Sequence, residues 1–175
     1  MLEIETKILD FDEKKLRENL EQNGADFKGK YLFRRWIFDL TKNKGEDEFV
    51  RLRTDGKRAT LTYKFRKGAG LDNTEEIETG IENFDDAAKL LSKIFNEGYY
   101  QENKCEKWDF EGVEVSLNLW PKIPPVLELE GGSDQKLEKV IKELEIKGKN
   151  IGNVGWSELY KRYGLDIHSF KILKF

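Results

Sequence analysis

The sequence predicts an α+β fold in which about eight antiparallel strands form a closed barrel with helices packed outside. Two observations lead to this prediction. Several short segments place charged residues at every second position, which is typical of a strand with one polar and one apolar face. Between these segments lie stretches whose apolar residues recur at helical spacing. Closing the strands into a barrel would give their polar faces a shared interior.

The strand pattern begins almost at the first residue and returns after each helix. Alternating or β-branched runs bounded by turn residues predict strands at 2–9, 31–40, 48–54, 59–65, 74–81, 99–110, 113–120 and 126–131. The dipeptide Asp55-Gly56 is a hairpin signal between two of these runs. The three strands that follow Gly98 are at hairpin distances from one another.

Helices are predicted from capping residues followed by an apolar stripe. Asp10 or Asp12 can cap a first helix, which ends near residue 23. Asn83 caps a second helix that runs to about residue 95, and Ser133 caps a third that runs to about residue 146. A last short helix covers 157–164. All of this fits a single domain over residues 1–175.

Composition excludes several classes of function. The formal charge is −3, with 31 basic and 34 acidic residues, so we expect no general affinity for nucleic acid. Cys105 is the only cysteine, which rules out an internal disulfide and favours a reducing compartment. No stretch approaches the roughly 20 apolar residues that cross a bilayer. We therefore expect a cytoplasmic protein without a membrane partner; its oligomeric state is left open, with a homodimer as one alternative.

Acids and bases are sorted by strand. Paired carboxylates stand on the first and the late strands, at Glu3, Glu5, Glu128 and Glu130. Cations stand on the middle strands, at Arg51, Arg53, Lys64 and Arg66. Any one pair of charged residues is explained more simply by the solvated face of a half-buried strand. A solvated face, however, does not require acidic and basic residues to stand on different strands. Carboxylates suit divalent cations, and Lys and Arg suit phosphate oxygens, so the joint pattern predicts a site for a highly charged ligand.

These motifs, in this order, resemble the CYTH or triphosphate tunnel metalloenzyme superfamily. Its members include class IV adenylate cyclases, thiamine triphosphatases and inorganic triphosphatases. The hallmark E-x-E-x-K is matched by Glu3, Glu5 and Lys7. The later marks are R-x-R at Arg51 and Arg53, T-x-K at Thr62 and Lys64, E-x-E at Glu76 and Glu78, a basic segment at 104–107, and E-x-E at Glu128 and Glu130. The resemblance covers residues 2 to about 163.

The resemblance implies a tunnel barrel whose interior binds a triphosphate and Mg²⁺ or Mn²⁺. The implied metal ligands are Glu3, Glu5, Glu76, Glu78, Glu128 and Glu130. The implied substrate-binding residues are Lys7, Arg51, Arg53, Lys64, Arg66, Lys104 and Lys107. The implied catalytic residues are Glu5, Lys7 and Lys64. The partner is then a small molecule that carries a triphosphate.

Three functions remain open at this point. We favour a metal-dependent triphosphatase, because gripping a triphosphate needs only the charges visible in the sequence. Cyclisation of ATP by a class IV-type adenylate cyclase also needs a binding site for adenine and ribose, which the sequence does not reveal. A polyphosphate- or nucleotide-binding module without turnover is the third alternative.

Two positions depart from the pattern of the superfamily. Relatives tend to carry Lys and Arg together on the sixth strand, whereas here Cys105 or Glu106 takes the place of the arginine. Asn118 stands near the place of an Asp, and its amide can coordinate through oxygen but cannot act as a base. We expect binding to survive these changes better than catalysis.

Overall fold

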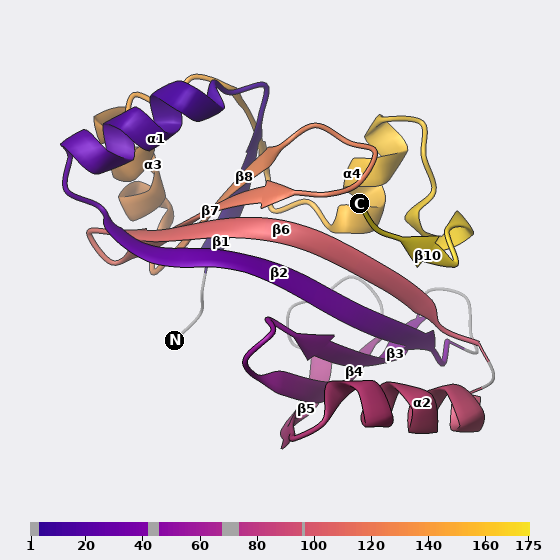
Figure 1. Cartoon of the computed structure of the whole chain (residues 1–175). Coiled ribbons are helices and arrows are strands. Elements are labelled where there is room, and N and C mark those ends of the chain that lie inside the picture. The colour runs from indigo at the N-terminus through magenta and orange to yellow at the C-terminus, as the bar shows by residue number, and fades with distance from the viewer. Residues whose placement is uncertain (1–3, 42–45, 68–73, 96) are drawn as a thin grey trace. The chain divides into compact units, whose positions relative to one another are not determined.

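The computed structural model describes residues 4–41, 46–67, 74–95 and 97–175 (Figure 1). The predicted α+β class is confirmed. The strands are β1 Ile4–Leu9, β2 Asp26–Asp39, β3 Glu46–Thr54, β4 Ala59–Lys67, β5 Thr74–Ile81, β6 Tyr99–Phe110, β7 Val113–Leu119, β8 Val126–Gly131, β9 Lys149–Gly152 and β10 Ile172–Leu173. The helices are α1 Glu13–Gln22, α2 Phe84–Phe95, α3 Asp134–Glu143 and α4 Trp156–Arg162, with a 3₁₀ turn at Ile167–Ser169.

The sheet is antiparallel, as predicted, apart from the short parallel pairing of β10 with β6. Its order is β5-β4-β3-β2-β6-β7-β8-β1-β9. Within the described ranges this hydrogen-bonded order has two ends, β5 and β9, so closure into a barrel stays a prediction. The described residues form two compact units: Met1–Tyr31 with Asn103–Ile167, and Leu32–Glu102 with His168–Phe175. We call them unit 1 and unit 2.

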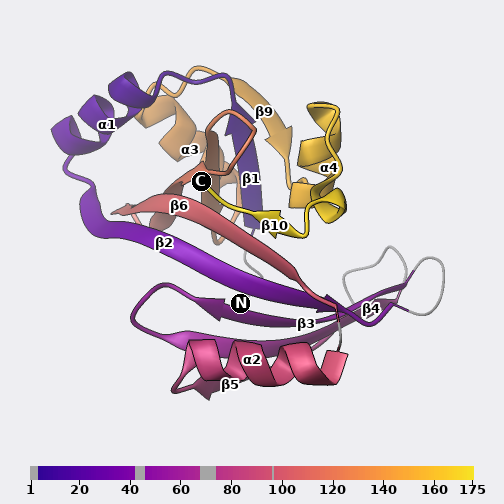
Figure 2. The ribbon, with the colours of Figure 1, turned by 45° about the vertical axis from the view of Figure 1, so that its right-hand side comes forward.

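Unit 1 has its core on one face of the sheet formed by β6, β7, β8 and β1. The apolar residues of these strands alternate with polar ones and pack under α1 and α3, which lie side by side (Figures 1 and 2). Fully buried members of this core are Leu20, Val113, Val115, Leu117, Leu127, Leu129, Val140 and Leu144. The opposite face of the same strands is therefore left for charged residues.

Unit 2 is organised in the same way. Helix α2 lies against β3 and buries Phe84, Ala88 and Leu91 against Phe38 and Leu52. Arg51 and Arg53, the two neighbours of Leu52 in β3, point to the other face of the sheet. As in unit 1, one face carries the core and the other is polar.

The predicted helix caps are confirmed. Asp12 accepts hydrogen bonds from the backbone N–H groups of Lys14 and Lys15, Asn83 accepts one from Asp86, and Ser133 accepts one from Lys136. Strand β2 begins earlier than predicted, at Asp26. Phe27 near its start packs on Trp108 of β6, with ring centroids 5.3 Å apart, and this contact is invisible in the local pattern.

Candidate functional site

The charged face of unit 1 is centred on β1 and β8. Their register pairs Glu5 with Glu130 and Lys7 with Glu128. The ammonium group of Lys7 lies 3.0 Å from a carboxylate oxygen of Glu5 and 3.1 Å from one of Glu128. The Lys7 side chain is only 3% exposed, against 31% for Glu5 and 20% for Glu128. The predicted common face of these residues is confirmed.

Three carboxylates gather on this face. Oxygen atoms of Glu5, Glu128 and Glu130 all lie within 4.8 Å of one another. Burial raises the pKa of Glu128 above its ordinary value and outweighs the opposing effect of Lys7, while the charge of Glu5 raises this pKa further. Lys7 therefore offsets only part of the cost of burying an ionised Glu128, and a further cation at this place would favour the ionised form. Hard oxygen ligands with a deficit of positive charge fit Mg²⁺ or Mn²⁺.

The face continues onto β7 and β6. Glu114 lies opposite Glu130 in the β7–β8 register, and its carboxylate accepts hydrogen bonds from Lys107 and Ser116. Lys107 thus belongs to the charged face, as predicted. Glu114 was missed by sequence reasoning, although the alternation of "VEVS" at 113–116 is the signal that could have found it.

The structure does not bring Lys104 and Lys107, which were both predicted to bind phosphate, onto one face of the sheet. The two residues are three positions apart on one strand, so their side chains leave opposite faces. Lys104 shares its face with Glu106, whose carboxylate accepts a hydrogen bond from Arg17 at 2.9 Å and pairs with Lys30 at 3.1 Å. Glu106 is thus held among cations on the side of the sheet that faces α1, away from the three carboxylates.

Cys105 and Asn118 lie opposite each other on the charged face. Burial raises the pKa of the Cys105 thiol to about 11, so the group stays protonated at neutral pH. The side-chain oxygen of Asn118 accepts a hydrogen bond from the Asn103 amide at 3.1 Å. Of Cys105 and Glu106, only Cys105 therefore shares the charged face with Lys107.

The charged face of unit 2 is built by β3, β4 and β5. Arg51 lies opposite Thr62, which lies opposite Glu78, and the Thr62 hydroxyl donates a hydrogen bond to Glu78 at 2.7 Å. Lys64 pairs with Glu76 at 2.9 Å, and this contact leads the effects that lower the pKa of Glu76. Among the described residues these two glutamates join no third metal-ligating side chain, so their role as metal ligands stays a prediction.

Arg51 is a half-buried cation on this face. Its Nε atom is buried and has no hydrogen-bond acceptor in the described part of the chain. Burial, followed by the neighbouring charge of Arg53, lowers its pKa, although Glu76 and Glu78 oppose this shift. Arg35 of β2 lies opposite Arg53 and adds a third guanidinium, which the sequence prediction missed. Such a group of arginines suits an anion with several oxygens.

The structure does not describe the side chains of two predicted site residues. Glu3 lies outside the described residues, and the side chain of Arg66 does as well. Their roles as metal ligand and phosphate ligand stay predictions.

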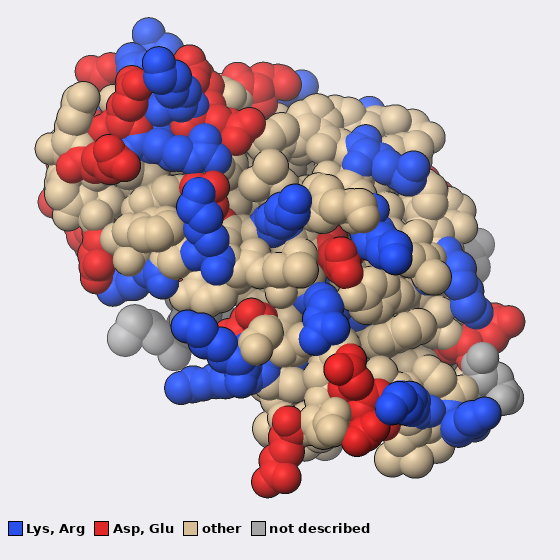
Figure 3. All heavy atoms as spheres, viewed as in Figure 1, with Lys and Arg blue, Asp and Glu red and all other residues tan. Residues whose placement is uncertain are grey.

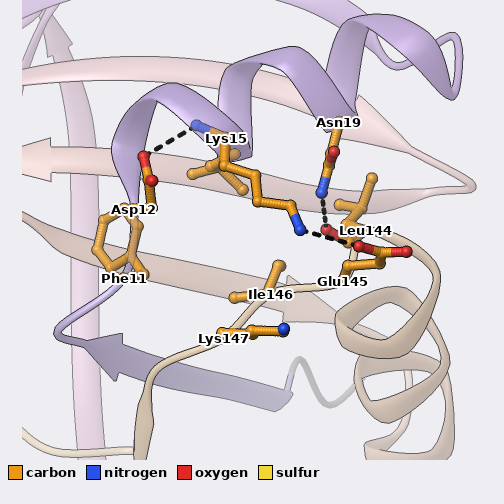
Figure 4. A pocket seen from close by; sticks show the side chains of 9 residues that line it. Phe11, Asp12, Lys15, Asn19, Leu144, Glu145, Ile146 and Lys147 are labelled. Atoms are coloured by element: carbon orange, nitrogen blue, oxygen red, sulfur yellow. Dashed lines mark hydrogen bonds and ion pairs between the residues drawn. The ribbon is translucent and has the colours of Figure 1, made fainter.

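A pocket of about 210 Å³ lies elsewhere in unit 1, beside the start of α1 (Figure 4). Lys15 pairs with Glu145 at 3.0 Å, and Asn19 donates a hydrogen bond to the Leu144 carbonyl at 2.7 Å (Figure 4). Because these polar groups satisfy one another, we do not consider the pocket a site. Around α1 and α3 the surface mixes both signs of charge (Figure 3). In the described ranges, no helix has the length and apolar character needed to cross a bilayer.

In each unit the sheet has one apolar and one charged face. The charged face of unit 1 carries Glu5 and Lys7 of the E-x-E-x-K motif, and that of unit 2 carries Arg51 and Arg53 of the R-x-R motif. The sequence matches the CYTH domain over residues 1–152. The chain belongs to the CYTH domain family. Among curated proteins, none matches this sequence.

Solved structures with a similar fold span nearly the whole chain. The PH1819 protein of Pyrococcus horikoshii is 20% identical, with a TM-score of 0.64 and coverage of 93% of this chain and 99% of that one. A candidate adenylate cyclase of Vibrio parahaemolyticus is 12% identical, with a TM-score of 0.66 and coverage of 92% and 98%. HpAC1 of Hippeastrum, described as having a dominant triphosphatase activity, is 11% identical, with a TM-score of 0.59 and coverage of 93% and 96%.

Proposed function

We propose that this protein is a divalent-cation-dependent phosphohydrolase that cleaves a triphosphate, either inorganic tripolyphosphate or an organic triphosphate. The observation that carries the proposal is the cluster of Glu5, Glu128 and Glu130 with Lys7 among them. The R-x-R and T-x-K motifs of the sequence support it, because Arg51, Arg53 and Lys64 are cations of the kind that a triphosphate requires. The triphosphatase activity named for the Hippeastrum protein, which has a similar fold, agrees with it.

Each side chain has a distinct role in this proposal. Glu5, Glu128 and Glu130 hold Mg²⁺ or Mn²⁺, which when bound neutralises phosphate oxygens and lowers the pKa of an attacking water. Lys7 and Lys64 donate hydrogen bonds to phosphate oxygens and stabilise the charge of the transition state. Arg51, Arg53 and Lys107 orient the polyphosphate chain, the two arginines through their two-pronged guanidinium groups.

The test is incubation with tripolyphosphate, ATP and thiamine triphosphate under Mg²⁺ or Mn²⁺, followed by separation of the products. Release of orthophosphate supports the proposal. Pyrophosphate with cyclic AMP would replace it by an adenylate cyclase, the activity attributed to the Vibrio protein. Protection against melting without any product would replace it by a binding module.

A pair of variants ties the activity to the carboxylate cluster. Glu128→Gln should lower turnover by about 100-fold or more, because outer-shell partners of metal sites already contribute 10- to 100-fold. The control is Glu143→Gln, which removes a carboxylate at the end of α3 on the helical side of unit 1 and should leave turnover unchanged. Equal activity in both variants would exclude the cluster from the reaction.

A further inference from the structure

Lys7 has a third partner besides its two carboxylates. Its ammonium nitrogen lies 5.7 Å from the centre of the Trp156 ring, within the roughly 6 Å range of a cation–π interaction. Trp156 opens α4 and is half-buried. It also lies beyond residue 152, where the match to the CYTH domain ends. A residue outside the matched segment therefore touches the centre of the charged face.

Binding of a divalent cation would change the surroundings of Lys7. The two carboxylates that pair with Lys7 belong to the cluster that suits such a cation. A cation there repels the ammonium group and competes for the same oxygen atoms. Because the Lys7 side chain is 3% exposed, water offers it little compensation. The face of Trp156 is then the attractive partner that does not compete with the metal.

The indole of Trp156 is itself firmly held. Its ring lies 4.6 Å from that of Trp120, which in turn makes an edge contact with Tyr160 at 6.2 Å. The hydroxyl of Tyr160 is buried and donates a hydrogen bond to the carbonyl of Pro121 at 2.8 Å. One end of α4 is thus fixed to the connection between β7 and β8. An aromatic face anchored in this way can define the position of a flexible lysine.

We propose that Trp156 is a positioning residue for Lys7, whose ammonium group it holds toward the substrate when a divalent cation occupies the Glu5–Glu128–Glu130 cluster. The inference rests on the proposed function, since the position of Lys7 matters most to phosphate binding. The contact between Trp156 and Lys7 can be tested without any turnover.

The experiment compares Trp156→Leu, which keeps apolar volume but has no π face, with Trp156→Phe, which keeps a weaker one. Tyr160→Phe is the matched control, because it loosens the same aromatic stack without touching Lys7. Two readouts are taken with metal alone: tryptophan emission during titration with Mg²⁺ or Mn²⁺, and the melting temperature. The third readout is kcat and KM for tripolyphosphate.

We expect a metal-dependent change of emission in the wild type and in Tyr160→Phe, and none in Trp156→Phe or in Lys7→Met, although both of these still gain melting temperature with metal. We expect kcat/KM to fall about 30-fold in Trp156→Leu, the factor that matches a desolvated cation–π interaction, with partial recovery in Trp156→Phe.

An unchanged emission response in Lys7→Met would overturn the proposal. So would kinetics in which Trp156→Leu behaves like Tyr160→Phe, because α4 would then act through stability alone. Absence of triphosphatase activity in the wild type would defeat the proposed function while leaving the emission titration to decide on the contact between Trp156 and Lys7.

Discussion

Lys7 and Glu128 face each other across the β1–β8 ladder, and the lysine ammonium nitrogen lies 3.1 Å from a carboxylate oxygen. Both side chains are largely removed from water, at 3% and 20% exposure. A charge pair in this setting is expensive to break, because the surviving partner remains buried without compensation. The metal-free protein thus uses Lys7 to neutralise a cluster of carboxylates that would otherwise repel one another.

Replacing Lys7 by Met should therefore lower the stability of the protein without metal but increase the stabilisation that a bound metal provides. Without metal, the free energy of unfolding at neutral pH should fall by roughly 3 kcal/mol, the usual cost of removing one partner of a buried pair. With Mg²⁺ or Mn²⁺, the variant should gain more stability than the wild type, since the metal no longer competes with an ammonium group. Urea unfolding with and without metal measures both effects; equal metal-dependent gains would mean that Lys7 does not occupy the metal's place.

Neighbouring arginines on β2 provide a second prediction with an internal control. Arg35→Ala should weaken the binding of tripolyphosphate by about tenfold or more, because Arg35 lies opposite Arg53 on the charged face. Arg34→Ala removes the same charge from the other face, where Arg34 packs on Phe84 and pairs with Asp85. It should lower stability but not affinity. Calorimetry that finds equal losses of affinity would show that net charge, not the face, governs binding.

The pH dependence of stability should report on Glu106. Burial alone would raise the pKa of Glu106, but its hydrogen bonds with Arg17 and Lys30 prevail and lower it. A carboxyl group with a lowered pKa stabilises the fold above its ordinary pKa of 4.5, and this contribution is lost as the pH falls through the lowered value. Glu106→Gln should cost about 1–2 kcal/mol at neutral pH. Unfolding curves at about pH 2 should show no difference; a constant difference at both pH values would point to packing instead.

The same geometry predicts the outcome of Glu106→Arg. The new guanidinium would stand beside Arg17 and Lys30, and like charges at this distance repel one another. The variant should melt at a lower temperature and show no gain in tripolyphosphate turnover. A rise in turnover would place residue 106 on the phosphate side of β6 and contradict the register of β6 with β7.

Much of the fold follows from local pattern. Alternation along β1, β3, β4 and β8 correctly assigned charged and apolar residues to faces, because a strand fixes the side of each residue by its parity. The short strands β9 and β10 were missed, since four and two residues carry little pattern of their own and pair with distant strands.

The site was predicted less completely. The opposite orientation of Lys104 and Lys107 follows from their odd spacing, and sequence analysis that treated 104–107 as one basic segment overlooked it. Arg35 was hidden because its strand carries apolar residues on both faces. The pairing of Lys7 with Glu128 and its contact with Trp156 depend on which distant strands and helices meet, and no local pattern contains that information.

Strand β6 carries two independent charge systems on its two faces, one through Lys107 and one through Glu106. Loss of a single codon within this strand would turn one part of it over relative to the other. Glu106 would then meet the carboxylates and Lys107 would meet Arg17, so one in-frame deletion would disturb both charge systems together. Missense changes alter one face at a time. Among relatives, the length of this strand should therefore be conserved more strictly than the identity of its residues.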